Sequence, residues 1–261
     1  MNQQIALDAV TTPPTWFPAN LAALGRRFER LSPLEVLRWA LVTCGDDVAL
    51  ATGFGASGVV LMHMVSRIRP GTFFFYLQTD LLFPETMALR DRLAETLPIQ
   101  FTEVPASLTL QQQSRHYGPE LWRHNPDLCC QLRKVEPLRR FLQSDSRRRA
   151  WVTGIRRDQS PTRANIGVVD WDYATGLLKI APLATWKQQQ VWDYIRRHDL
   201  PYNRLHDQGY PSIGCMPCTQ AISAGGQERD GRWVGRDKVE CGIHVQPGGQ
   251  RLTRSLGMGH R

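Results

Sequence analysis

Short apolar runs alternate with longer amphipathic stretches along most of the chain, and this alternation constrains the fold more than any other feature. Apolar runs of this length typically form buried strands, whereas the longer stretches form helices. The predicted strands are Val48–Ala51, Thr72–Leu77, Ile99–Val104, Trp151–Ile155 and Leu177–Ile180, and the predicted helices cover 33–44, 59–68, 84–97, 129–143 and 185–197. Strands alternating with helices favour an α/β fold with an open, mostly parallel, twisted sheet and helices on both faces.

The 261 residues are expected to form one domain with less regular ends. Residues 1–30 contain Pro13-Pro14 and have weak periodicity, so they are predicted to be a loosely packed lead-in. The domain is placed at residues 31–245, and its part beyond Leu200 is expected to be loop-rich. Residues 246–261 are rich in glycine and poor in apolar residues, which predicts a flexible tail.

The composition predicts a cytoplasmic protein. No apolar run reaches the roughly 20 residues that a membrane span needs, and the N-terminus lacks the layout of a secretion signal. Thiols stay reduced in the cytoplasm, so the six cysteines are interpreted as ligands and catalysts, with disulfides or inert buried thiols as the alternative.

The chain carries a formal net charge of +8, which suits nucleic acid, an anionic membrane or a small polyanionic substrate. The basic residues are dispersed among separate motifs and do not form a stripe with interleaved aromatic residues. This distribution favours a small polyanion over a nucleic-acid groove.

The cysteines divide into two pairs, a solitary residue near the C-terminus and Cys44. The pairs are Cys129-Cys130 and Cys215-Met216-Pro217-Cys218, and four such thiolates can surround a metal centre. Judged by spacing alone, a structural zinc site is the better guess. Cys241 stands apart in a glycine-flanked segment, where it can act as a nucleophile. Cys44 follows an apolar helical stretch and is expected to be a small buried residue.

Two loops follow predicted strands at the edge where open α/β sheets bind ligands. The first, Thr52–Gly58, is rich in glycine and can present backbone N–H groups to a phosphate, although a tight strand-to-helix turn explains it equally well. The second, Gly154–Arg163, carries three arginines, whose guanidinium groups suit phosphate or sulfate oxygens. The alternative for this second loop is a solvated surface segment.

Several motifs together resemble those of the assimilatory sulfonucleotide reductases, which reduce adenylyl sulfate (APS) or its 3′-phosphorylated form (PAPS). The motifs are Thr52-Gly53-Phe54-Gly55-Ala56, Leu82-Phe83-Pro84-Glu85-Thr86, Arg133-Lys134-Val135-Glu136-Pro137-Leu138, the loop 154–163 and Glu240-Cys241-Gly242-Ile243-His244. The resemblance implies an adenine-nucleotide α-hydrolase-like sheet. It also implies thioredoxin-dependent reduction of APS to sulfite and AMP through an S-sulfocysteine, in assimilatory sulfate reduction.

The resemblance also implies the residues of the site. Members with these two cysteine pairs carry a [4Fe–4S] cluster and mostly prefer APS. The implied cluster ligands are Cys129, Cys130, Cys215 and Cys218, and the implied nucleophile is Cys241. The predicted substrate-binding residues are Thr52, Phe54, Gly55, Ser57 and His244 of the motifs, together with five cations that can offset the repulsion between a thiolate and an anionic group: Lys134, Arg156, Arg163, Arg229 and Arg232.

This chain departs from the family pattern at two places, both expected to line the nucleotide pocket. Ser57-Gly58 stands where the family usually has acidic residues, and Gln78-Thr79-Asp80 stands in place of Asp-Thr-Gly. Reduction of PAPS, alone or beside APS, is the nearest alternative function. A tRNA-modifying sulfurtransferase and a zinc-bound nucleic-acid module are further alternatives. The sequence leaves the oligomeric state open, and it is compatible with a homo-oligomer.

Overall fold

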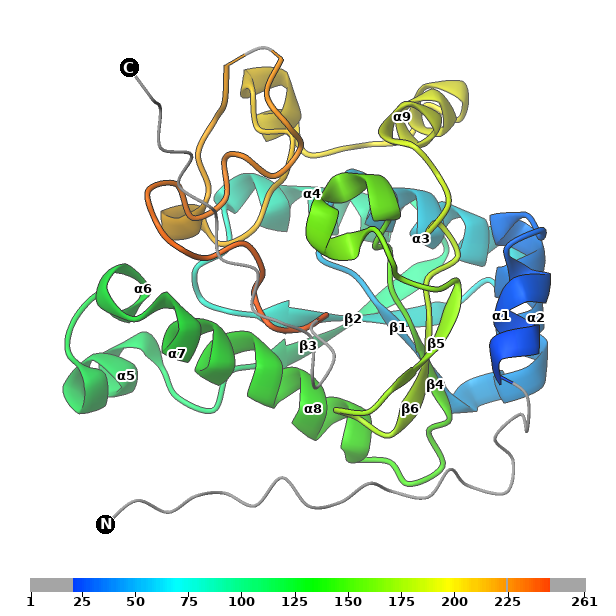
Figure 1. Ribbon diagram of the computed structural model, residues 1–261, viewed down its shortest axis with the longest axis horizontal. Helices are drawn as coiled ribbons and strands as arrows, with labels where there is room; N and C mark the ends of the chain where they lie inside the picture. The colour runs from blue at the N-terminus through cyan, green and yellow to red at the C-terminus, as the bar shows by residue number, and fades with distance from the viewer. Residues whose placement is uncertain (1–20, 224, 245–261) are drawn as a thin grey trace, which may run out of the picture.

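A six-stranded sheet forms the centre of the computed structural model, which describes residues 21–223 and 225–244 (Figure 1). The strands are β1 (Val48–Ala51), β2 (Thr72–Gln78), β3 (Ile99–Pro105), β4 (Ala150–Val152), β5 (Val169–Asp172) and β6 (Leu177–Ile180). Their order is β3-β2-β1-β4-β6-β5, and every neighbouring pair is parallel except β5 and β6. The predicted fold class is therefore confirmed. The antiparallel edge strand β5 was not predicted.

Helices cover both faces of this sheet. The described α-helices are α1 (Leu21–Phe28), α2 (Pro33–Cys44), α3 (Ala56–Ile68), α4 (Pro84–Thr96), α5 (Leu110–Tyr117), α6 (Leu121–His124), α7 (Pro126–Cys130), α8 (Glu136–Gln143) and α9 (Gln188–Arg197). On one face, α2, α3, α4 and α9 pack against Leu50 and Phe74. On the other face, α8 packs against Ala49, Phe75 and Trp151. Burial of these apolar surfaces drives the two layers together.

Local signals explain why α2 begins and ends where predicted. Ser32 and Glu35 form a reciprocal capping box, in which the Glu35 N–H donates to Ser32 Oγ at 3.3 Å. Pro33 occupies the first turn, where its missing N–H costs nothing. Gly45 ends the helix with a φ of +56°, a conformation that favours glycine.

Two segments differ from the sequence-based expectation. Residues 21–28 of the expected lead-in form α1, which packs on β5 with Phe28 in the core. The helix predicted over 129–143 consists of α7, a π-helical turn at Gln131–Val135 and α8. Pro137 has no N–H to donate to the carbonyl of Arg133, which accounts for the interrupted α-helical ladder. The expected tail, 246–261, lies outside the described residues.

The switch point of the sheet lies between β1 and β4. From β1 the chain continues to β2 and β3 on one side, whereas β4 leads to β6 and β5 on the other. Loops that leave the carboxyl ends of such strands diverge and leave a crevice. Two glycines allow the loops to meet there: a Cβ on Gly58 would lie 2.9 Å from Thr52 Oγ1, and one on Gly154 would lie 3.3 Å from the Gly58 nitrogen. Among the described helices, none is long and apolar enough to cross a membrane.

Candidate active site

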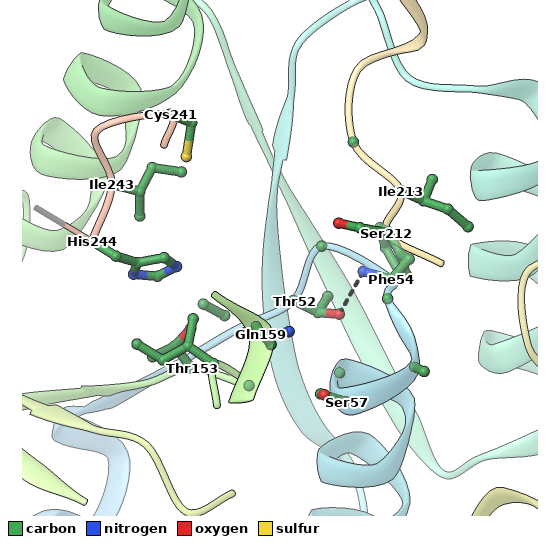
Figure 2. A pocket seen from close by; sticks show the side chains of 18 of the residues that line it. Thr52, Phe54, Ser57, Thr153, Gln159, Ser212, Ile213, Cys241, Ile243 and His244 are labelled. Carbon is green, nitrogen blue, oxygen red and sulfur yellow. Dashed lines mark hydrogen bonds between the residues drawn. The ribbon is translucent and has the colours of Figure 1, made fainter. Parts of the chain in front are cut away.

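A cavity of about 260 Å³ occupies the crevice at the switch point. It is lined by all eleven residues predicted to react with or bind the substrate: Thr52, Phe54, Gly55, Ser57, Lys134, Arg156, Arg163, Arg229, Arg232, Cys241 and His244. Figure 2 shows Cys241, Ile243 and His244 along one side of the cavity, opposite Thr52, Phe54 and Ser57. The structure thus brings together residues that lie almost 200 positions apart in the chain, because the loops and the C-terminal segment meet at one edge of the sheet.

The side-chain hydroxyl of Thr52 stabilises the glycine-rich turn from within. The Phe54 N–H donates to Thr52 Oγ1 at 3.0 Å, and Phe54 adopts a positive φ of 57° (Figure 2). Gly55 then caps the N-terminus of α3 without a side chain, so the first N–H groups of this helix lie at the cavity. Helix N-termini favour anions, which makes this turn suitable for a phosphate.

Arg156 lines the cavity, and each of its three guanidinium nitrogens already donates to a protein side chain. It donates to Asp158 Oδ1 at 2.9 Å, to Glu228 Oε2 at 2.5 Å and to Ser57 Oγ, and its side chain is 2% exposed. Arg156 therefore links three segments of the cavity wall to one another, because its bonds go to Ser57, Asp158 and Glu228.

Arg163 and Arg229 also have a carboxylate partner, Glu240. Arg163 donates to Glu240 through Nε at 2.8 Å and through Nη2 at 2.9 Å, and Arg229 donates at 3.1 Å. Burial opposes the charge on Glu240, but the hydrogen bonds and charge of Arg163 lower the pKa of this carboxyl to about 2. Burial and the neighbouring Arg163 lower the pKa of Arg229 to about 10.

Lys134 and Arg232 differ from these arginines, because no described carboxylate forms an ion pair with either of them. Arg232 stacks over Trp233 at 4.6 Å from the ring centroid and is buried. Lys134 extends from the π-helical turn. Two cations without a described carboxylate partner are therefore available to an anionic ligand in this cavity.

Cys241 is partly buried, and its surroundings favour the thiolate. Burial opposes ionisation, but the charge of Lys134, a hydrogen bond from the Ile243 N–H and the charge of Arg229 together lower the pKa of the thiol, even though Glu240 acts in the opposite direction. A thiolate is the nucleophilic form of cysteine. Its position beside the cations makes Cys241 a suitable nucleophile toward an anionic substrate.

His244 closes one side of the cavity. Its ring stacks on Trp151 with centroids 5.9 Å apart and an interplanar angle of 7°. Burial first, and then the charges of Lys179, Arg163 and Arg229, lower the pKa of His244 well below its usual value. His244 is therefore neutral in this conformation.

The four remaining site cysteines gather beside this cavity. Cys129 and Cys130 end α7, whereas Cys215 precedes a short 3₁₀ turn and Cys218 is the last residue of that turn. All four thiols are free and buried, and they line one small second cavity. Lys134 and Trp233 line both cavities, so the cysteine site and the anion site share a wall.

The chemistry of the cysteine site suits an anionic all-thiolate centre. Burial raises the pKa of Cys129 to about 11 and that of Cys130 to about 12, so the thiols stay protonated unless a metal displaces their protons. Five cations surround the thiols: Arg133, Lys134, Lys238, Arg232 and Arg236. Within the described ranges, no three His, Cys, Asp or Glu side chains converge closely enough to hold a single metal ion.

The two departures from the family pattern have different environments. Ser57 and Gly58 line the cavity as expected, and so does Thr79. Gln78 and Asp80 do not line it, which corrects that expectation. Asp80 instead forms an ion pair with the buried Arg133. Arg133 Nε also donates a hydrogen bond to the Thr79 carbonyl oxygen.

The sequence did not identify Trp151 and Glu228 as site residues. Trp151 was assigned to a buried strand, and only the folded chain shows His244 stacked on it. Glu228 lies in a loop far from Arg156 in the sequence. A single acidic residue in a loop does not indicate which basic residue it pairs with in the folded chain.

Fold and site together define a class of protein: an adenine-nucleotide α-hydrolase-like sheet with an anion site and a solitary cysteine at its switch point. The sequence profile of the phosphoadenosine phosphosulfate reductase domain matches residues 47–221. The chain belongs to this family.

Similar proteins cover most of the chain. An adenosine 5′-phosphosulfate reductase of Salinibacter ruber is 54% identical and covers 89% of this chain and 91% of its own length. A phosphoadenosine 5′-phosphosulfate reductase of Gloeobacter violaceus is 46% identical, with coverages of 86% and 93%. The crystal structure of the PAPS reductase of Candida auris in complex with phosphate superposes with a TM-score of 0.65 at 31% identity. That match covers 77% of this chain and 96% of the fungal one.

Proposed function

We propose that the protein reduces APS to sulfite and AMP in sulfate assimilation, with a dithiol protein such as thioredoxin as the electron donor. The observation that carries this proposal is the placement of the Cys241 thiol in the same cavity as Lys134, Arg232 and the glycine-rich turn. A nucleophilic sulfur beside an anion site is what transfer of a sulfonate group requires.

In the first step, the Cys241 thiolate attacks the sulfate sulfur of APS. A sulfur–sulfur bond forms while the bond between that sulfur and the bridging phosphate oxygen breaks, and AMP leaves with the electron pair. The product is an S-sulfocysteine. Lys134 and Arg232 offset the repulsion between the thiolate and the anionic sulfate. Their charges thereby stabilise the transition state of the transfer.

In the second step, one thiolate of the dithiol protein attacks the Sγ atom of Cys241 and expels sulfite. The resulting mixed disulfide is resolved by the second thiol of the donor, which returns the Cys241 thiol and leaves the donor oxidised. The dithiol supplies both electrons, so the balance requires no other reductant.

The charges in the cavity favour APS as the substrate. Arg156, Arg163 and Arg229 are already paired with carboxylates, which leaves Lys134 and Arg232 for the ligand. APS carries one negative charge on its phosphate and one on its sulfate, so the two cations match it. PAPS adds a 3′-phosphate that these two cations do not neutralise.

PAPS reduction is the second candidate. The names of the Gloeobacter violaceus relative and of the Candida auris structure support it. Turnover of the two nucleotides under identical conditions distinguishes the candidates.

The cysteine site fits a [4Fe–4S] cluster, because such clusters bind to four thiolates and this site offers four buried free thiols within a ring of cations. Cys129, Cys130, Cys215 and Cys218 would hold it. When bound, it would supply negative charge beside Lys134, and the dithiol would remain the source of electrons.

The direct test measures sulfite release from APS and from PAPS with reduced thioredoxin, on protein whose iron and zinc contents are known. We expect sulfite from APS, with iron in the preparation. Faster turnover of PAPS would shift the assignment to the second candidate. The absence of sulfite with either nucleotide would refute the proposed reaction, and zinc in place of iron would refute the cluster.

A further inference from the structure

Glu240, immediately before the nucleophile, fastens the Cys241 segment (residues 239–244) to the arginine-rich loop. Its carboxylate accepts two hydrogen bonds from the Arg163 guanidinium, at 2.8 and 2.9 Å, and one from the Thr162 hydroxyl at 2.9 Å. Arg229 donates a further hydrogen bond to it at 3.1 Å. The Glu240 side chain is 10% exposed, so these bonds form away from bulk water. Charge-assisted bidentate pairs of this kind are strong and fix geometry.

A second attachment follows the nucleophile. The ring of His244 lies flat on Trp151, and the indole of Trp151 is itself fixed by a hydrogen bond from Nε1 to Asp172 Oδ2 at 3.0 Å. Ile243 packs beside this stack against the apolar cluster on the α8 face of the sheet. The Cys241 segment is thus attached on both sides of its thiol.

Gly242 joins the two attachments with a φ of +96°, which favours glycine. A Cβ at this position would also lie 3.1 Å from Val135 Cγ2, in the π-helical turn that carries Lys134. The backbone therefore passes close to the turn that carries Lys134. The contacts of Glu240 and of His244, on the two sides of Cys241, therefore fix the position of the thiol relative to Lys134.

We propose that Glu240 and Trp151 are positioning residues that hold the Cys241 segment across the cavity. Glu240 acts through Arg163, and Trp151 acts through His244. Neither residue needs to touch the nucleotide for this role. The inference rests on the proposed function only for the identity of Cys241 as the reacting group, because the attachments themselves are formed without substrate.

Hydrogen–deuterium exchange of the peptide that contains residues 239–244 tests the first attachment, in the full chain and without nucleotide. Glu240→Gln keeps the shape of the side chain and removes its charge, and we expect exchange in this peptide to rise about tenfold or more. Glu240→Asp keeps the charge and should restore part of the protection. The matched control is Glu29→Gln, which removes a carboxylate that accepts from Arg157 Nη1 at 2.9 Å outside this network and should leave this peptide unchanged.

The second attachment is tested from the side of the segment, because Trp151 is a core residue whose replacement can unfold the sheet. His244→Phe keeps a ring for stacking, whereas His244→Leu removes it. We expect protection close to that of the wild type at neutral pH with Phe and a several-fold loss with Leu.

Two results would overturn the proposal: unchanged exchange in Glu240→Gln, or equal exchange in the two His244 variants. These measurements need no substrate, so they remain decisive even if APS is not the substrate. Conversely, a protein that reduces APS while Glu240→Gln exchanges like the wild type would keep the proposed function and lose the positioning role.

Discussion

Protonation of His244 should release the Cys241 segment, and the size of this effect follows from the environment of the ring. In the docked segment, burial and the charges of Lys179, Arg163 and Arg229 hold the His244 pKa well below 6.5. In a released segment the imidazole recovers a pKa near 6.5. The docked state therefore favours the neutral ring, and its advantage is lost as the pH falls below 6.5.

Each pH unit below 6.5 weakens docking by about tenfold, or about 1.4 kcal/mol, until the docked-state pKa is reached. Between pH 7.5 and pH 5.5 the ratio of released to docked segment should thus rise by about tenfold. Glu240 adds no pH dependence between pH 7.5 and pH 5.5, because its lowered pKa of about 2 keeps it ionised throughout. Its stabilising effect is lost only as the pH falls from about 4.5 toward 2.

The assay is hydrogen–deuterium exchange of the peptide that contains residues 239–244 at pH 7.5, 6.5 and 5.5. His244→Phe serves as the reference at each pH, because it keeps the ring and cannot titrate. The ratio of wild-type to variant exchange removes the intrinsic pH dependence of the chemistry. A ratio that stays constant from pH 7.5 to 5.5 would show that docking does not hold His244 neutral, and it would refute the predicted release on protonation.

Three further predictions concern charge, metal and stability. Lys134→Met should slow sulfonate transfer from APS by about a hundredfold, and Lys134→Arg by less, because only the charge is kept; single-turnover kinetics measures both. Cys218→Ser should lower the bound iron of the purified protein, whereas Cys44→Ser should not; elemental analysis compares the two. Arg156→Met leaves two partly buried carboxylates, Asp158 and Glu228, without their arginine and should cost about 3 kcal/mol of unfolding free energy, measured by urea denaturation.

Each of these predictions has a result that opposes it. Equal rates for the Met and Arg variants would remove the charge of Lys134 from the mechanism. Iron retained in Cys218→Ser would remove that thiol from the ligand set. An unchanged urea midpoint for Arg156→Met would mean that its ion pairs do not stabilise the fold.

Much of the fold could be predicted because its signals are local. Residues 33–44 carry a capping box, a proline at the start and a glycine at the end, and β1 and β2 are apolar runs bounded by turns. The missed strand β5 has only a weak signal, because apolar and charged residues alternate over just four positions, Val169–Asp172, and the strand pairs with β6 alone. The π-helical turn likewise depends on a single proline within an otherwise helical pattern.

The site could be predicted less completely, since motifs mark residues and not their partners. The sequence indicated the arginines of the cavity, but it could not indicate that Arg156 is already engaged by Asp158 and Glu228. Nor could it indicate that Trp151, in a strand, is the surface on which His244 stacks. Both relations arise from tertiary contacts between segments far apart in the chain.

The central claim is that the sulfur of Cys241 takes the sulfonate from the nucleotide. Mass spectrometry of the Cys241 peptide, after incubation of the protein with APS in the absence of a dithiol, tests it directly. The account predicts a mass increase of one sulfonate group on this peptide, which disappears with release of sulfite when reduced thioredoxin is added. An unmodified Cys241 peptide from a protein that nonetheless releases sulfite would contradict it.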